Sequence, residues 1–114
     1  MLDSNRGERS YEGASLNLSC VTEINTAIVD IPFLLNINWE QPMVSHGLIN
    51  DVANYSKEGL TIYTRNITFH SLNFEDIGNY TCILTISSLE NSMVLPSTKQ
   101  TQYSITLGVH GMLT

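Results

Sequence analysis

The sequence predicts an all-β fold, a two-sheet antiparallel sandwich. Apolar and polar residues alternate with period two along six short segments, which is the pattern of strands with one buried face. Turn-forming residues separate these segments roughly every 10 to 15 residues. No segment combines the i, i+3, i+4, i+7 spacing of an amphipathic helix with a capping residue.

Length and composition agree with a small sandwich. The chain has 114 residues, enough for one domain, and 42% of them are hydrophobic, enough to form a core. Charged residues make up only 14%, against about 25% in an average domain. Asn, Ser and Thr replace them and favour strands, turns and caps over helix interiors. We expect one domain over residues 1–110, followed at 111–114 by a C-terminal tail or a remnant of an expression vector.

The expected strands are recognised in chain order by apolar residues at alternate positions. Turn signals separate the first three, since Glu12-Gly13 precedes the first, Gln41-Pro42 ends the second and Glu58-Gly59 precedes the third. The residues expected to face the core, strand by strand, are Leu16, Leu18 and Cys20; Leu35, Ile37 and Trp39; Leu60 and Ile62; Ile67 and Phe69, with Leu72 beyond them; Tyr80, Cys82, Leu84 and Ile86; and Tyr103, Ile105, Leu107 and Val109.

The charge of the chain excludes two classes of partner. The formal net charge is −6, and the five Lys and Arg residues are not clustered. A nucleic-acid-binding protein needs clustered basic residues to neutralise phosphates, and binding to anionic lipid needs them too. No stretch approaches the roughly 20 apolar residues of a membrane span, so we expect no direct membrane insertion by this domain.

The cysteines and the glycosylation sequons point to an extracellular protein. Cys20 and Cys82 are too few and too far apart for a local zinc site, which leaves one long-range disulfide or two separate buried thiols. Asn-x-Ser/Thr sequons begin at Asn17, Asn54, Asn66 and Asn79. Four sequons in a chain with few charges are typical of a secreted protein or of the ectodomain of a cell-surface glycoprotein, where a disulfide persists and N-linked glycans are attached.

The strand register sets the expected direction of the sequons. Asn17 and Asn79 should point outward, because the residue that follows each of them points inward. Asn54 and Asn66 are expected in or near loops and should carry the most fully occupied glycans.

Three residues in order, Cys20, Trp39 and Cys82, resemble the pattern of the immunoglobulin superfamily. The segment D-I-G-N-Y-T-C at residues 76–82 is similar to the D-x-G-x-Y-x-C motif of that family. The similarity extends from about residue 10 to residue 109. It implies an immunoglobulin-like sandwich in which Cys20 and Cys82 form an inter-sheet disulfide that packs on Trp39.

The same resemblance gives roles to the residues of the motif. Asp76 and Gly78 would turn the chain, and the buried hydroxyl of Tyr80 would bond to the backbone just upstream. Asp76 would be held by a basic partner, either Arg65 or Lys57.

The subtype follows from spacing within the resemblance. Cys82 follows Trp39 by 43 residues, which is short for a variable-type domain, and the last strand lacks the Gly-x-Gly bulge of that type. Cys20 and Trp39 are 19 residues apart, which is long for an intermediate-set (I-set) domain. The resemblance implies an I-set domain with an expanded 23–32 loop; a shortened variable-type domain is the alternative.

No pattern in the sequence predicts catalysis, a cofactor or a metal site. His46, His70 and His110 are far apart and lack a Cys, Asp or Glu at ligand spacing. The Gly-x-Ser-x-Gly, P-loop and His-Glu-x-x-His motifs are absent from the sequence. We therefore expect a non-enzymatic protein without a metal or a cofactor.

Candidate binding residues lie in two loops and on one strand. The sandwich would place the 23–32 and 88–100 loops at one end, with Asn66 near that end. The apolar loop candidates, which form either a contact patch or a small satellite core, are Ile28, Val29, Met93, Val94 and Leu95. Ile83 should face outward from its strand, either as ordinary surface or as the centre of a contact. The sheet that contains this strand would also include the strands around Trp39 and Tyr103. The other residues expected on its outward face are Asn38, Glu40, Thr81, Gln102 and Ser104.

The resemblance implies an extracellular module that mediates cell adhesion by binding a protein partner, or a second copy of itself as a homodimer. The alternatives are a ligand-binding module of a receptor ectodomain, for example of a receptor tyrosine kinase, and a passive structural spacer. The net charge of −6 disfavours flat self-association, because like charges would meet across the two-fold axis, although salt screens the repulsion.

Overall fold

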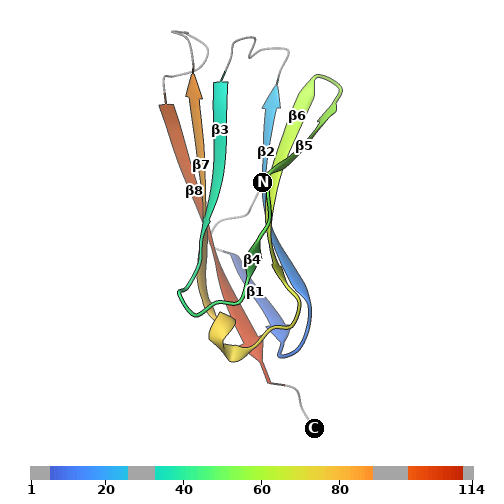
Figure 1. Cartoon of the computed structure of the whole chain (residues 1–114), viewed down its shortest axis with the longest axis vertical. Coiled ribbons are helices and arrows are strands. Elements are labelled where there is room, and N and C mark those ends of the chain that lie inside the picture. Colours follow the sequence, from blue (N-terminus) through green and yellow to red (C-terminus); the bar gives the residue numbers. More distant parts are fainter. Residues whose placement is uncertain (1–5, 26–32, 89–97, 112–114) are drawn as a thin grey trace.

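The computed structural model describes residues 6–25, 33–88 and 98–111, whose strands form two sheets packed face to face (Figure 1). The strands are β1 (Arg6–Tyr11), β2 (Leu16–Asn25), β3 (Phe33–Glu40), β4 (Leu48–Ile49), β5 (Ala53–Lys57), β6 (Leu60–Phe69), β7 (Gly78–Ser88) and β8 (Thr98–His110), and a 3₁₀ turn, η1 (Phe74–Asp76), precedes β7. One sheet has the strand order β1-β8-β7-β3, and the other has the order β2-β6-β4 with β5 also paired to β6. The predicted all-β sandwich is confirmed.

The core lies between the sheets and consists mainly of the predicted alternate residues. Along β3, β7 and β8 these residues point inward, and the residues between them face solvent. The buried apolar side chains of the core are Leu18, Cys20, Ile37, Trp39, Ile67, Phe69, Leu72, Tyr80, Cys82, Leu84, Ile105, Leu107 and Val109. A fully buried Leu, Ile, Val or Phe side chain contributes roughly 1.5–3 kcal/mol, so the alternation is the main stabilising pattern of the sequence.

Residues 60–69 form one continuous strand, β6, and the expected inward direction of Leu60 and Ile62 is wrong. Thr61 is buried instead, because the odd-numbered residues farther along β6 face the core and period two extends back from them. Glu58 and Gly59 form the two-residue turn of the hairpin between β5 and β6, with φ angles of 51° and 81°. Two successive residues at positive φ are typical of the type I′ turn that joins short hairpins.

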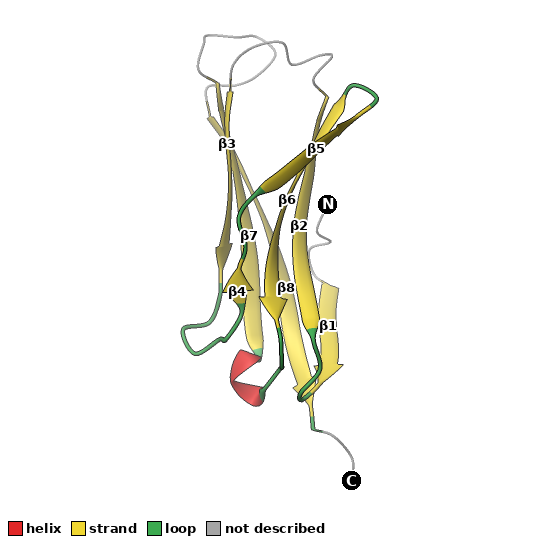
Figure 2. Ribbon diagram, turned by 45° about the vertical axis from the view of Figure 1, so that its right-hand side comes forward, coloured by secondary structure: helices red, strands yellow, loops and turns green. Residues whose placement is uncertain are grey.

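Three strands have no counterpart among the expected ones. Every residue of β4 and β5 is exposed, so neither strand carries an alternation that the sequence could reveal. β1 pairs in parallel with the last part of β8, from Arg6 opposite Ile105 to Tyr11 opposite His110. Between β3 and β4, residues 41–47 form no strand and carry the chain from one sheet to the other (Figure 2).

The two cysteines form a disulfide that joins the sheets, as the resemblance implies. Cys20 lies in β2 and Cys82 in β7, with their Cα atoms 6.3 Å apart. Trp39 of β3 is paired directly with Cys82, and its indole Nε1 donates a hydrogen bond to the main-chain oxygen of Arg65 at 2.8 Å. An intramolecular disulfide is typical of extracellular or secreted proteins.

Candidate functional site

The loop candidates Ile28, Val29, Met93, Val94 and Leu95 lie outside the described residues, so their role stays a prediction. The first part of the expected 23–32 loop is a strand, since β2 continues to Asn25 and Ile24 is buried there.

Truncating these loop side chains tests whether they pack inward. We expect Val29→Ala and Leu95→Ala each to lower the free energy of unfolding by about 2–5 kcal/mol, as for buried aliphatic residues. Leu34→Ala is the matched control, because Leu34 is 61% exposed and its truncation should cost less than about 0.5 kcal/mol. Urea unfolding measures all three variants. Losses as small as that of the control at both loop positions would instead indicate an exposed contact patch.

The chain turns at η1 just before β7, and the hydrogen bond predicted for the Tyr80 hydroxyl is present at this corner. The Tyr80 side chain is fully buried, and its hydroxyl donates a hydrogen bond to the main-chain oxygen of Asp76 at 2.6 Å. Ser45 Oγ, from the 41–47 connection, lies 2.7 Å from the same hydroxyl. Burial raises the pKa of Tyr80 above its ordinary value and the nearby Asp76 charge adds to this, although the hydrogen bond with Ser45 opposes it. The phenol is therefore neutral at physiological pH.

Asp76 holds this corner through main-chain N–H groups. Its carboxylate is fully buried, and Oδ1 accepts a hydrogen bond from the backbone N–H of His46 at 2.7 Å. Oδ2 accepts from the backbone N–H of Asn73 at 3.0 Å, which closes a capping box around η1. The imidazole Nδ1 of His46 lies 3.4 Å from Oδ1. The carboxylate thus ties the 41–47 connection to the start of β7.

The expected basic partners of Asp76 are wrong. Arg65 instead donates from Nε to the main-chain oxygen of Asn50 and from Nη1 to that of Ile37, each at 2.7 Å. Lys57 is exposed at the end of β5, in the hairpin with β6. Arg65 therefore links the two sheets by bonding to carbonyl oxygens.

Gly78 lies where the chain passes close to Pro42. Its φ of 151° is in the region that favours glycine, and a Cβ atom added there would lie 2.7 Å from Pro42 Cγ. This supports the role in the turn that the motif implies for Gly78.

The outward side chains of β3, β7 and β8 form a second candidate surface, named here the β3-β7-β8 face. The strand register arranges them in rows, with Asn38 of β3 opposite Ile83 of β7 and Ile83 opposite Gln102 of β8. The next rows are Glu40, Thr81 and Ser104 on one side, and Asn36, Thr85 and Gln100 on the other, followed by Leu34, Ser87 and Thr98. All six residues predicted for this face lie on it.

The β3-β7-β8 face is nearly uncharged. Glu40 is the one residue with a formal charge among the outward residues of these three strands, and most of the others are Asn, Gln, Ser or Thr. Ile83 is half-buried at the centre of the face, and Leu34 is 61% exposed near one end. Leu34 was not among the residues predicted for this face, although its position directly before the inward Leu35 places it there.

The sequons lie mostly away from this face. Asn17 and Asn79 are exposed, as predicted. Asn17 and Asn66 lie on the outward surface of the opposite sheet, and Asn79 lies at the lower end of the β3-β7-β8 face, where its Oδ1 accepts a hydrogen bond from Thr106 at 2.8 Å. Glycans on Asn17 and Asn66 would project from the opposite sheet, whereas a glycan on Asn79 would border the rows around Ile83, four residues away on β7.

Two expectations about the sequons are wrong. Asn66 lies within β6 and not in a loop, whereas Asn54 is the second residue of β5, next to the 50–52 connection and so near a loop as predicted. Asn66 pairs with Ser19, six residues before the end of β2, so it lies roughly 20 Å from the end that carries the 23–32 loop. The loop expected at Asn66 is a strand because the outward face of β6 carries polar residues typical of loops.

Within the described residues, no three His, Cys, Asp or Glu side chains cluster in a way that could hold a metal ion. The described part of the chain contains no helix that is long and apolar enough to cross a membrane. The sequence matches no model of a known protein family and no curated protein.

Proposed function

We propose that the chain is a non-enzymatic immunoglobulin-like recognition module of a cell-surface or secreted protein. The disulfide beside Trp39 and the tyrosine contact at Tyr80 support this assignment. The direct crossing from β3 to β4, without the two additional strands of a variable-type domain, favours the I-set type over the variable type. Its function is cell adhesion, by protein binding through the β3-β7-β8 face.

The neutrality of this face is the observation that carries the proposal. The net charge of −6 opposes association in general, but the face contributes only Glu40 to it. Asn and Gln side chains each offer donors and an acceptor, so the face can pair with a second copy of itself. Ile83 and Leu34 supply apolar contact area within this polar surface.

Light scattering coupled to size exclusion, over a concentration series, tests the proposal. We expect the glycosylated chain to form dimers at high concentration. Ile83→Arg should weaken the dimer by about tenfold or more, because it adds two like charges near the two-fold axis and removes the apolar centre. The matched control is Leu48→Arg, on β4 in the opposite sheet, where Leu48 is 54% exposed.

The outcomes separate the candidate functions. Loss of the dimer in Ile83→Arg alone supports adhesion through this face, provided that its far-UV circular dichroism matches that of the natural chain. Equal weakening by both variants would place the contact elsewhere. A strict monomer at every concentration would contradict homophilic adhesion and leave binding of a different protein, a receptor module or a spacer.

A further inference from the structure

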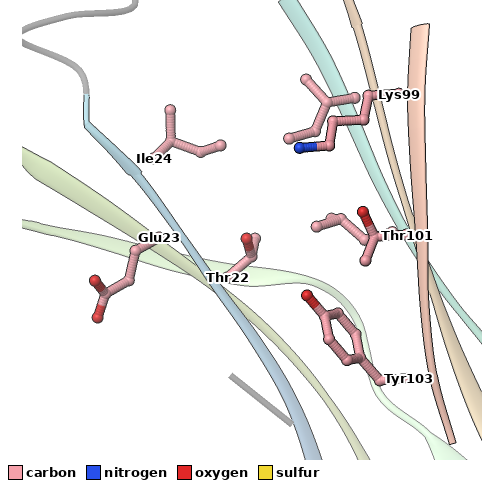
Figure 3. Close-up of a pocket in the computed structure, with 8 residues that line it drawn as sticks. Thr22, Glu23, Ile24, Lys99, Thr101 and Tyr103 are labelled. Carbon is pink, nitrogen blue, oxygen red and sulfur yellow. The ribbon is translucent and has the colours of Figure 1, made fainter. Parts of the chain in front are cut away.

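A cavity of about 220 Å³ lies between the two sheets, at the end where β2 stops and β8 begins. Thr22 and Ile24 of β2 line one side, and Leu84 of β7 with Lys99, Thr101 and Tyr103 of β8 line the other (Figure 3). Thr101 and Tyr103 hold half-buried inward positions that continue the core, since Thr101 pairs with Leu84 and Tyr103 with Cys82, and Lys99 follows the same alternation at the exposed start of β8. Inward positions of a sandwich normally carry apolar side chains, so the hydroxyl groups of Thr22, Thr101 and Tyr103 here require an explanation, and the exposed Lys99 places an ammonium group at the mouth of the same cavity.

The polar groups converge on the cavity. Figure 3 shows the Lys99 ammonium reaching from β8 toward β2, and the Tyr103 hydroxyl pointing toward Thr22. Thr22 is only 6% exposed, and no hydrogen bond from its side chain to another described residue is seen. Lys99 likewise forms no ion pair within the described part of the chain. The carboxylate of Glu23 points away from the cavity, so the charge directed into it is positive.

The strand edges beside the cavity have no described neighbour. β1 pairs with β8 only from Ile105 onward, so no described strand covers the edge of β8 between Lys99 and Ser104. No described strand pairs with the outer edge of β2 either. The cavity therefore lies between two strand edges that have no described neighbour on this side.

We propose that this cavity binds a small organic anion that carries an apolar ring or short chain. The anionic group would pair with Lys99 Nζ and accept hydrogen bonds from the hydroxyls of Thr22 and Tyr103, and the apolar part would contact Ile24 and Leu84. A cavity of about 150 Å³ is large enough for benzene, so a volume of about 220 Å³ accommodates one ring and a carboxylate. Repulsion from the net charge of −6 is weak here, because salt screens charges beyond about 10 Å.

Three probes of the same shape and different charge test this proposal: benzoate, benzamide and benzamidine, which are anionic, neutral and cationic. Each is titrated into the ¹⁵N-labelled full chain, and the amide shifts are followed by NMR. We expect benzoate to shift the amides of Thr22, Ile24, Leu84 and Thr101 in a saturable way. Benzamide should bind about tenfold more weakly and benzamidine more weakly still, since charge-assisted hydrogen bonds are roughly twice as strong as neutral ones.

Lys99→Met identifies the charge that is responsible. This variant should lose the preference for benzoate over benzamide and keep the affinity for benzamide. Lys57→Met, on the exposed strand β5, removes the same charge elsewhere and should leave both affinities unchanged. Thr22→Val, which keeps the side-chain shape, should weaken benzoate several-fold.

Several results would overturn the proposal. They are no saturation by benzoate up to about 20 mM, shifts confined to amides remote from the cavity, equal binding of benzamidine and benzoate, or an unchanged preference in Lys99→Met. The spectrum of each variant without a probe reports whether it is folded, so a loss of binding cannot be confused with unfolding.

Discussion

The Cys20→Ala/Cys82→Ala double variant should lose about 4 kcal/mol of unfolding free energy relative to the oxidised chain. The disulfide closes a loop of 62 residues. In the chain-entropy model, opening such a loop increases the entropy of the unfolded state and so stabilises that state by about 4 kcal/mol. Since a domain of this size is stable by only about 5–15 kcal/mol, the loss is a large fraction of the total. Urea unfolding at equilibrium measures it.

The natural chain under reducing conditions is the control for this prediction. Its unfolding free energy should fall to within about 1 kcal/mol of that of the double variant, because both lack the same cross-link. Mass spectrometry of the unreduced, denatured chain should detect no free thiol. Two free thiols, or a loss below about 1 kcal/mol in the double variant, would contradict the prediction.

Asp76→Ala should cost about 3 kcal/mol of unfolding free energy. The fully buried carboxylate accepts hydrogen bonds from the backbone N–H groups of His46 and Asn73, and its removal leaves both without an acceptor. An unsatisfied buried donor costs about 1–3 kcal/mol. Thermal and urea unfolding, read by near-UV circular dichroism, measure the effect.

The neighbouring residue provides the matched control for Asp76. Glu75 is exposed and belongs to the same 3₁₀ turn, so Glu75→Ala should change the free energy of unfolding by less than about 0.5 kcal/mol. Asp76→Asn should give an intermediate loss, because its single carbonyl oxygen can satisfy one of the two N–H groups. Equal losses for Asp76→Ala and Glu75→Ala would show that the buried hydrogen bonds contribute little.

Strands with one buried face could be predicted from the sequence because burial imposes period two on the side chains. Tyr80, Cys82 and Leu84 illustrate this, since all three are buried and the residues between them are not. β4 and β5 could not be predicted, because a strand exposed on both faces has no such pattern. Their pairing with β6 depends on backbone hydrogen bonds, which any sequence can form.

Backbone hydrogen bonds also explain why the predicted partners of Asp76 were wrong. The prediction sought a basic side chain, but the carboxylate bonds to main-chain N–H groups, which leave no signature in the residue type. The cavity did leave a signature. Extending the alternation of Tyr103 back by two and four residues places Thr101 at an inward position and Lys99 on the same side at the exposed start of β8, so a polar side chain and a cation follow the core residues along one strand. The β3-β7-β8 face could be predicted around Ile83 because its register follows directly from the buried residues.

The parallel pairing of β1 with β8 determines how this domain would respond to tension. A pull on residue 6 and on residue 110 acts along the two strands in opposite directions, because both strands run toward the same end. The hydrogen bonds between Arg6–Tyr11 and the end of β8 would then be sheared together, and not opened one after another. After they rupture, the residues enclosed by the disulfide cannot extend, so the bridge limits how far the unfolded chain can lengthen. The bridge therefore sets an upper limit on the elongation of this domain under tension.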